Sequence, residues 1–366
     1  MPDDDAFSHL SARFYSQDWY LASQNHTKIY QKCIRRRMRA VLTLQIYSSP
    51  KAFPAGHIGN MSKGKDAGIG EICTSKPTWF GSRSATRDAF CNTAKGGYPM
   101  IFDFHTHCFP DALAPRAIAH LAEISRKCGL SPTTNGTAQG VLDQMHAHGV
   151  DKSLICNVST NAHQMPKVNA FAAELARTQP ELYALGSLHP HGEDLEGQIR
   201  MLKDAGIKGI KLHPDYIRIE FDDPVLHPIF ELCTAYDMFL LTHTGYDPNS
   251  PDHMHCRPKQ VKTVMENFPR LTLIAAHMGG IDCEQEVLDL LCGKQLYMDT
   301  SHSGSYPHRH PLLHKILQKH DPALLLYGSD CPWSGQEREQ SFVLQAPVSD
   351  DVKQAIFWDN AMRLMK

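Results

Sequence analysis

Residues 100–107 read MIFDFHTH, a short apolar run that ends on two histidines. The run has the length and composition of a buried β-strand, and it begins a pattern that continues to the end of the chain. Further apolar runs follow, and longer segments separate them. Together these runs predict eight strands, at residues 101–104, 152–158, 182–188, 207–212, 238–242, 271–276, 296–300 and 324–328.

Amphipathic segments between these runs predict helices at residues 140–148, 167–178, 195–205, 258–267 and 284–291, and residues 355–365 predict a closing helix. Strands that alternate with helices form parallel sheets, and eight such units in about 250 residues fit a closed barrel. The sequence therefore predicts the α/β class and a (β/α)₈ TIM barrel over residues 99–366. An open doubly wound sheet is the alternative, but no Gly-x-Gly-x-x-Gly turn follows any predicted strand.

Residues 1–98 have a different composition. A basic cluster at residues 35–39 precedes a strand-like run at 40–47, and a stretch rich in Gly, Ser and Lys follows. Regular periodicity is hard to find there, as in flexible segments. We interpret this part as a poorly ordered N-terminal extension, or as sequence upstream of a natural start at Met100. A regulatory or targeting extension is the alternative.

Composition excludes several classes of partner. The net charge of −2 favours neither nucleic acid nor a membrane surface, and no apolar run approaches the roughly 20 residues of a membrane span. The 11 cysteines are scattered without a Cys-x-x-Cys pair, which is typical of reduced thiols. We expect a cytoplasmic protein with a small-molecule substrate, and a homodimer is left open.

Polar residues occupy six of the eight predicted strand ends, which is where barrel enzymes carry their catalytic groups. An unpaired ionisable group there costs stability, so a structural role does not explain the pattern. These end residues are His105, His107, His213, His243, His277, Asp299 and Asp330.

Strand alternation places Asp103, His105 and His107 on one face, with Phe102 and Phe104 towards the covering helices. A His-x-His pair at a strand end can offer two imidazoles to one ion. Together with His243 and Asp330, the pair predicts one divalent metal ion, with zinc as the expected metal. The alternatives are a buried core histidine at His277 and a helix N-cap at Asp330.

The chain resembles the amidohydrolase superfamily from about residue 100 to 366, specifically its second large family. That family includes aminocarboxymuconate-semialdehyde and resorcylate decarboxylases as well as hydrolases. The resemblance rests on the motifs at 103–107, 209–214, 242–245, 276–280 and 327–333.

The resemblance implies that one divalent ion, usually zinc, is bound by His105, His107, His243 and Asp330. It also implies that His277 lies beside the metal-bound water. Binuclear relatives, such as the TatD-like hydrolases, use a glutamate or a carboxylated lysine at the end of strand four.

This chain has Lys211 below His213 at the end of strand four and no glutamate. A mononuclear site is therefore expected, with a carbamate on Lys211 as the alternative. Lys211 is otherwise expected to be a fixed positive charge or a partner of Asp103.

These residues predict a metal-dependent hydrolase that cleaves an amide, ester or lactone of a small, anionic organic molecule. In this hypothesis Asp330 takes the proton of the attacking water and later passes it to the leaving group. His277 orients the nucleophile or stabilises the developing charge. The alternative is non-oxidative decarboxylation of a small aromatic or muconate-type acid at the same site. A barrel that has lost its chemistry and only binds ligands is the third reading. The expected substrate-binding residues are Lys211, His213, His255 and Arg257, and loop residues Arg218, Arg309 and His302 are further candidates.

Overall fold

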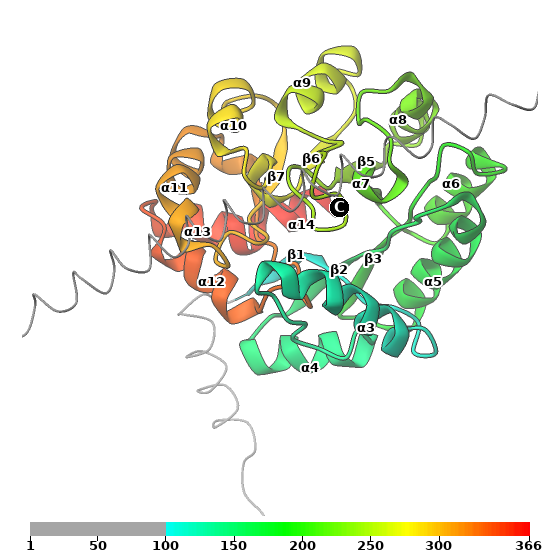
Figure 1. The fold of residues 1–366 in the computed structure, drawn as a ribbon, viewed down its shortest axis with the longest axis horizontal. Helices are drawn as coiled ribbons and strands as arrows, with labels where there is room; N and C mark the ends of the chain where they lie inside the picture. The colour runs from blue at the N-terminus through cyan, green and yellow to red at the C-terminus, as the bar shows by residue number, and fades with distance from the viewer. Residues whose placement is uncertain (1–99) are drawn as a thin grey trace, which may run out of the picture. The chain divides into compact units, whose positions relative to one another are not determined.

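The structure is a computed structural model, and it describes residues 100–366. The extension predicted for residues 1–98 lies outside the described residues. Figure 1 shows strands at the centre of a ring of helices. The described residues form eight strands: β1 Phe102–Thr106, β2 Lys152–Cys156, β3 Leu182–Leu185, β4 Gly209–Leu212, β5 Phe239–Thr242, β6 Leu273–Ala275, β7 Tyr297–Asp299 and β8 Leu325–Leu326.

The strands close into a parallel barrel. Parallel pairing joins β1 to β3 in one sheet and β4 to β8 in another. A bridge between Gly186 and Ile210 links the two sheets on one side, and a bridge between Thr106 and Cys331 links them on the other. The predicted (β/α)₈ barrel is therefore confirmed.

Helices surround the strands, and the five that the sequence predicted between strands are present. These are α4 Ala138–His148, α5 Met165–Thr178, α6 Leu195–Asp204, α9 Pro258–Asn267 and α10 Glu284–Leu290. The predicted closing helix is a π-helical turn at Ala355–Asp359 followed by α14 Asn360–Leu364. The sequence reasoning missed α3 Ala114–Ser125, α7 Pro214–Ile217, α8 His227–Ala235, α11 His310–Lys319, α12 Gln336–Gln345 and α13 Asp350–Gln354.

Local chemistry explains the helix ends. The Thr137 side chain accepts a hydrogen bond from the Gly140 amide at the start of α4, which satisfies one of the unpaired donors of the first turn. Gly149 ends α4 in the left-handed region, at φ 68°, where a side chain would be strained. Pro258 opens α9 at a position where no amide donor is needed.

The barrel interior is filled by apolar side chains below the strand ends. Phe104 of β1 and Phe239 of β5 contact each other across the barrel, with ring centroids 5.8 Å apart. Leu154 and Leu241 belong to the same buried cluster. Ala361 in α14 and Met365, which directly follows it, belong to this cluster as well. The polar groups at the strand ends therefore lie directly above a closely packed apolar layer inside the barrel.

One expectation about β1 was wrong. Phe102 and Phe104 pack in the barrel interior and not against the covering helices. The register between β1 and β2 shifts between Asp103 and Thr106, so one extra residue lies in β1. A bulge of this kind breaks strict alternation and re-aims the next side chain. His105 consequently contacts the polar centre, while Asp103 bonds to Ser329 and Gln336 instead.

Among residues 100–366, no helix is long and apolar enough to cross a membrane.

Candidate metal centre and active site

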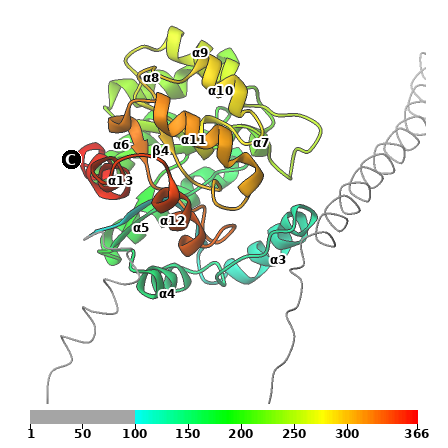
Figure 2. The same cartoon turned by 90° about the vertical axis from the view of Figure 1, so that its left-hand side faces the viewer.

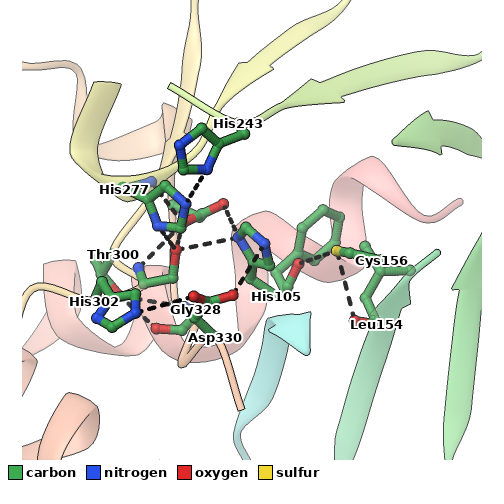
Figure 3. Close-up of polar contacts among 12 residues, drawn as sticks. His105, Leu154, Cys156, His243, His277, Thr300, His302, Gly328 and Asp330 are labelled. Carbon is green, nitrogen blue, oxygen red and sulfur yellow. Dashed lines mark hydrogen bonds and ion pairs between the residues drawn. The ribbon is translucent and has the colours of Figure 1, made fainter. Parts of the chain in front are cut away.

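Three of the four predicted ligands meet at one point. His107 Nε2 lies 3.0 Å from Asp330 Oδ1, and His105 Nε2 lies 3.5 Å from the same oxygen. The strand-end motifs of β1 and β8 thus bring two imidazoles and one carboxylate within reach of a single ion. Figure 3 shows His105 and Asp330 facing each other at the centre of this group.

Each β1 histidine is oriented by its other ring nitrogen. His107 Nδ1 donates to the Cys156 carbonyl oxygen over 2.9 Å, and His105 Nδ1 lies 2.9 Å from Asp299 Oδ2. When each ring is neutral, Nε2 therefore carries no hydrogen and presents a lone pair on both histidines. Both lone pairs then lie near the Asp330 carboxylate, an arrangement of donor atoms that a cation stabilises.

The fourth predicted ligand, His243, lies in a neighbouring group. Its Nδ1 is 3.0 Å from His277 Nε2, and its ring stacks on His213 with centroids 4.2 Å apart. Its candidate ligand atoms fall with those of His213 and Asp247, not with those of the first three residues. His243 Nε2 is buried and has no hydrogen-bond partner among residues 100–366. The four predicted ligands are therefore close together without all facing one point.

Lys211 lies beneath the centre. Its Nζ is 3.1 Å from His105 Nε2, so the ammonium can donate to that ring. Burial lowers the pKa of Lys211, and Asp299 and Asp330 among its neighbours oppose the shift. Asp103, the other expected partner, is bonded to Ser329 and Gln336 instead. Of the two expectations for Lys211, the partnership with Asp103 was wrong.

Burial and hydrogen bonds set the charges of the site. Burial alone would raise the pKa of Asp330, but the imidazoles of His107 and His302 beside the carboxylate hold it well below its usual range. Burial lowers the pKa of His243 and His277 well below that of a free histidine. The carboxylate is thus ionised and these two imidazoles are neutral, the protonation states in which such side chains bind metal ions.

Sequence reasoning gave little weight to the β7 end, which supplies three site residues. Asp299 holds His105, Ser301 Oγ lies 2.8 Å from His277 Nδ1, and His302 Nε2 lies 3.2 Å from Asp330 Oδ2. Figure 3 shows His302 on the far side of the Asp330 carboxylate from His105. The run of polar residues from 299 to 303 was the signal that could have identified them.

The backbone is strained around the same point. His277, His302 and Asp330 all have positive φ, at 59°, 61° and 68°. Residues with a Cβ rarely adopt this region, and such strain is concentrated at functional sites. Each of these residues follows a strand end, so the strain turns its side chain towards the shared centre.

A cavity of about 760 Å³ opens over the centre. His105, His107, Lys211, His213, His243, His277 and Asp330 all line it. Tyr216, Tyr246 and Trp333 supply aromatic walls, and the exposed cations Arg116, Lys167 and Arg218 lie along it. Such a cavity can hold an organic molecule with a negative charge.

Two expected substrate residues lie elsewhere. His255 Nδ1 is bonded to Asp215 Oδ1 over 2.9 Å, and Arg257 forms an ion pair with Glu286 at 2.8 Å. Among residues 100–366, neither His255 nor Arg257 belongs to the set that lines the cavity. Arg309 is likewise committed to an ion pair with Glu284.

A parallel (β/α)₈ barrel with histidines and aspartates gathered at its strand ends defines a class of metal-dependent enzymes. The sequence matches the family model described as amidohydrolase over residues 102–366, and the chain belongs to that family. It is an enzyme of the amidohydrolase superfamily. A search of curated proteins gave no match.

Solved structures share the fold. A TIM-barrel protein from Bordetella bronchiseptica superposes with a TM-score of 0.56 at 19% identity, over 73% of this chain and 98% of that one. The 5-carboxyvanillate decarboxylase of Sphingomonas paucimobilis gives 0.52 at 17% identity, again over 73% and 98%. A 2,6-dihydroxybenzoate decarboxylase from Rhizobium gives 0.53 at 15% identity, over 73% and 98%. At these identities the likeness establishes the barrel alone.

Proposed function

We propose that the enzyme holds one divalent metal ion and hydrolyses an amide, ester or lactone of a small anionic molecule. His105, His107 and Asp330 would hold the ion. His243, whose Nε2 has no hydrogen-bond partner among residues 100–366, would be the fourth ligand. When bound, the ion supplies Lewis-acid polarisation and a more acidic water. The neutral imidazoles, the ionised carboxylate and the unpartnered nitrogen fit such a cation.

The observation that carries hydrolysis is the position of the Asp330 carboxylate. Its carboxylate lies on the cavity wall, with His107 Nε2 3.0 Å from Oδ1 and His302 Nε2 3.2 Å from Oδ2. These two imidazoles hold the pKa of Asp330 well below its usual range. An ionised carboxylate in this position accepts a proton from a nucleophilic water and returns it to the leaving group. His302, bonded to the other carboxylate oxygen, holds Asp330 in place during both transfers.

The remaining side chains orient and bind. Ser301 fixes the His277 ring through Nδ1, and the ring lies on the cavity wall. His277 Nε2, which contacts His243, would hold the oxygen that gains charge once His243 binds the ion instead. The exposed cations Arg116, Lys167 and Arg218 attract an anionic group of the substrate. His213 and Tyr216, stacked with ring centroids 3.8 Å apart, form a flat wall beside the reacting groups.

Non-oxidative decarboxylation is the second candidate, and the cationic, aromatic-walled cavity favours it. Solved barrels similar to this chain include decarboxylases of 5-carboxyvanillate and 2,6-dihydroxybenzoate. The same cavity would take an aromatic acid, with Arg218 near its anionic end. Zinc is the expected ion for a histidine-rich set of ligands. Manganese is tested beside it because a 5-carboxyvanillate decarboxylase similar to this chain was solved with manganese.

One experiment separates the two reactions. The full chain, stripped with a chelator and reloaded with Zn²⁺ or Mn²⁺, is incubated with matched pairs of compounds. Each pair is a hydroxybenzoate and a derivative that keeps its carboxylate but carries an ester, lactone or amide elsewhere on the ring. Release of acid from the second compound, with incorporation of ¹⁸O from labelled water, supports hydrolysis. Release of carbon dioxide from the first compound alone replaces it with decarboxylation. Turnover by the stripped protein in either assay contradicts the metal site itself.

A further inference from the structure

Helix α3 lies in an unusual place for a barrel helix. It belongs to a long connection between β1 and α4, and Ala114 is its one buried residue. By contrast, α4 buries Val141, Leu142 and Met145 in the layer between helices and strands. Figure 2 shows α3 projecting beyond the ring of helices, while α4 lies within it. The packing position that follows β1 is thus occupied by α4, and α3 is additional.

One face of α3 is nevertheless apolar. Leu113, Ala117, Leu121 and Ile124 recur at helical spacing and share a stripe along the helix. All four line the cavity that also contains His107 and Asp330. The stripe spans twelve residues, and the eleven steps between its ends cover about 16 Å of helix. Apolar stripes of this length are normally covered, because exposing them to water costs free energy.

The opposite wall of this part of the cavity is apolar as well. Val168 and Phe171 on α5 line it, and neither is fully buried. Arg116 and Lys167 lie on the same two helices and are exposed, so cations border the apolar surface. The cavity therefore has a polar end at Asp330 and an apolar arm between α3 and α5.

The volume of the cavity also indicates a substrate longer than one ring. Cavities of about 300–1,000 Å³ hold ligands of drug size. At about 760 Å³ this cavity is larger than an acid with a single ring requires. A substrate confined to the polar end would leave the apolar arm in contact with water. An elongated substrate covers it.

We infer that the substrate is amphiphilic. Its reacting end lies at Asp330, and an apolar tail longer than one ring fills the apolar arm of the cavity between α3 and α5. The inference rests on the proposed function for the position of the reacting end alone. The substrate itself fills this arm of the cavity, because the walls of the arm are continuous with the walls of the reaction site. Ala117 is then a specificity-determining position, since its small side chain leaves room for the arm.

The test measures binding, so it does not depend on turnover. Calorimetric titration of the zinc-loaded full chain uses phenylalkanoic acids from phenylacetate to phenyloctanoate. Affinity is expected to rise roughly threefold to fourfold for each methylene group that enters the arm. Ala117→Phe is expected to fill the arm and abolish this gain. If Ala117→Phe does not fold, Ala117→Leu replaces it and is expected to reduce the gain. Ala119→Phe is the matched control, because Ala119 is exposed on the same helix and does not line the cavity.

Three results overturn the inference. Affinity could be the same for every acid, or the two phenylalanine variants could change it equally. The third is a dimer in sedimentation velocity that Ala117→Phe dissociates, since a second copy would then cover α3. The proposed function fails separately. If affinity rises with the length of the acid but the hydrolysis and decarboxylation assays give no product, the amphiphilic substrate stands and the proposed reaction fails. If the assays give product but affinity does not change with length, the proposed reaction stands and the amphiphilic substrate fails.

Discussion

His107 Nε2 and Asp330 Oδ1 lie 3.0 Å apart, although 223 residues separate them in the sequence. The pair joins the first strand of the barrel to the turn after the last one, where the ring of strands closes. His107 Nδ1 donates to the Cys156 carbonyl, so the lone pair of Nε2 is the atom that faces Asp330 and can bind a cation or a proton.

Asp330→Asn is expected to lower kcat by about a hundredfold to ten-thousandfold, because the amide cannot accept the proton of a nucleophile. Steady-state kinetics on the metal-loaded protein measure the loss. Asp289→Asn is the control, since Asp289 is exposed and bonds to Gln285 on α10. A variant at 330 with near-normal kcat would remove Asp330 from the reaction.

His107→Gln is expected to reduce bound metal from about one ion per chain to nearly none after dialysis. Elemental analysis by mass spectrometry gives the ratio. His120→Gln provides the comparison, because His120 is exposed and lines the outer cavity away from the three converging residues. Equal metal content in both variants would show that the ion, if bound, lies elsewhere.

Asp299→Asn is expected to weaken metal affinity by about tenfold to a hundredfold while the fold remains intact. The cause is positional, since Asp299 holds the His105 ring through Nδ1. Competition with a chromophoric chelator measures the affinity, and circular dichroism checks the fold. Unchanged affinity would mean that the His105–Asp299 pair has a purely structural role.

Arg218→Gln is expected to raise KM for anionic substrates by about tenfold with little change in kcat, because a cation that attracts substrate uniformly affects binding alone. Arg218 is exposed on the cavity wall. Arg200→Gln is the matched control, since Arg200 pairs with Glu196 on α6. An unchanged KM would place the anionic group of the substrate nearer Arg116 or Lys167.

The burial of His320 is expected to make the free energy of unfolding depend on pH, whether or not a metal ion is bound. His320 accepts a hydrogen bond from the Gly293 amide and donates one to the Leu296 carbonyl, so the neutral ring satisfies both contacts. Burial lowers the pKa of His320 below its unfolded value of about 6.5. The unfolded chain therefore takes up the proton first, and the stability present above about pH 6.5 is lost as pH falls.

Thermal unfolding between pH 8 and pH 5 measures this effect. The wild type is expected to lose at most about 1.4 kcal/mol per pH unit through His320, and His320→Gln removes that slope. His163→Gln, at an exposed position, retains it. Parallel curves for the wild type and His320→Gln would show that the ring does not control the transition.

Much of the fold was predictable because each strand carries its own signal. The apolar runs are short and bounded by polar residues, and their C-terminal ends collect histidine and aspartate. Since all parallel strands of a barrel end at one face, His105, His107 and Asp330 could be placed together from the sequence alone. The order of the strands then followed from their order in the chain.

What the sequence reasoning missed depends on irregular backbone. No residue pattern announces the extra residue in β1, so the interior position of Phe104 was assigned to the wrong face. The orientation of His243 is set by neighbouring rings from β4 and β6, which local sequence does not encode. The stripe on α3 was readable from its spacing, yet a helix that does not follow the repeat was easy to miss.

The three left-handed residues limit which sequences can occupy this site. At 277, 302 and 330 the main chain disfavours most side chains before any chemistry is considered, and β-branched residues most of all. Aspartate and asparagine tolerate this region better than most. Variation at 330 is therefore restricted twice, once by the reaction and once by the shape of the turn. Among variants selected for folding alone, we expect glycine and asparagine to replace aspartate there, and isoleucine, valine and threonine to be absent.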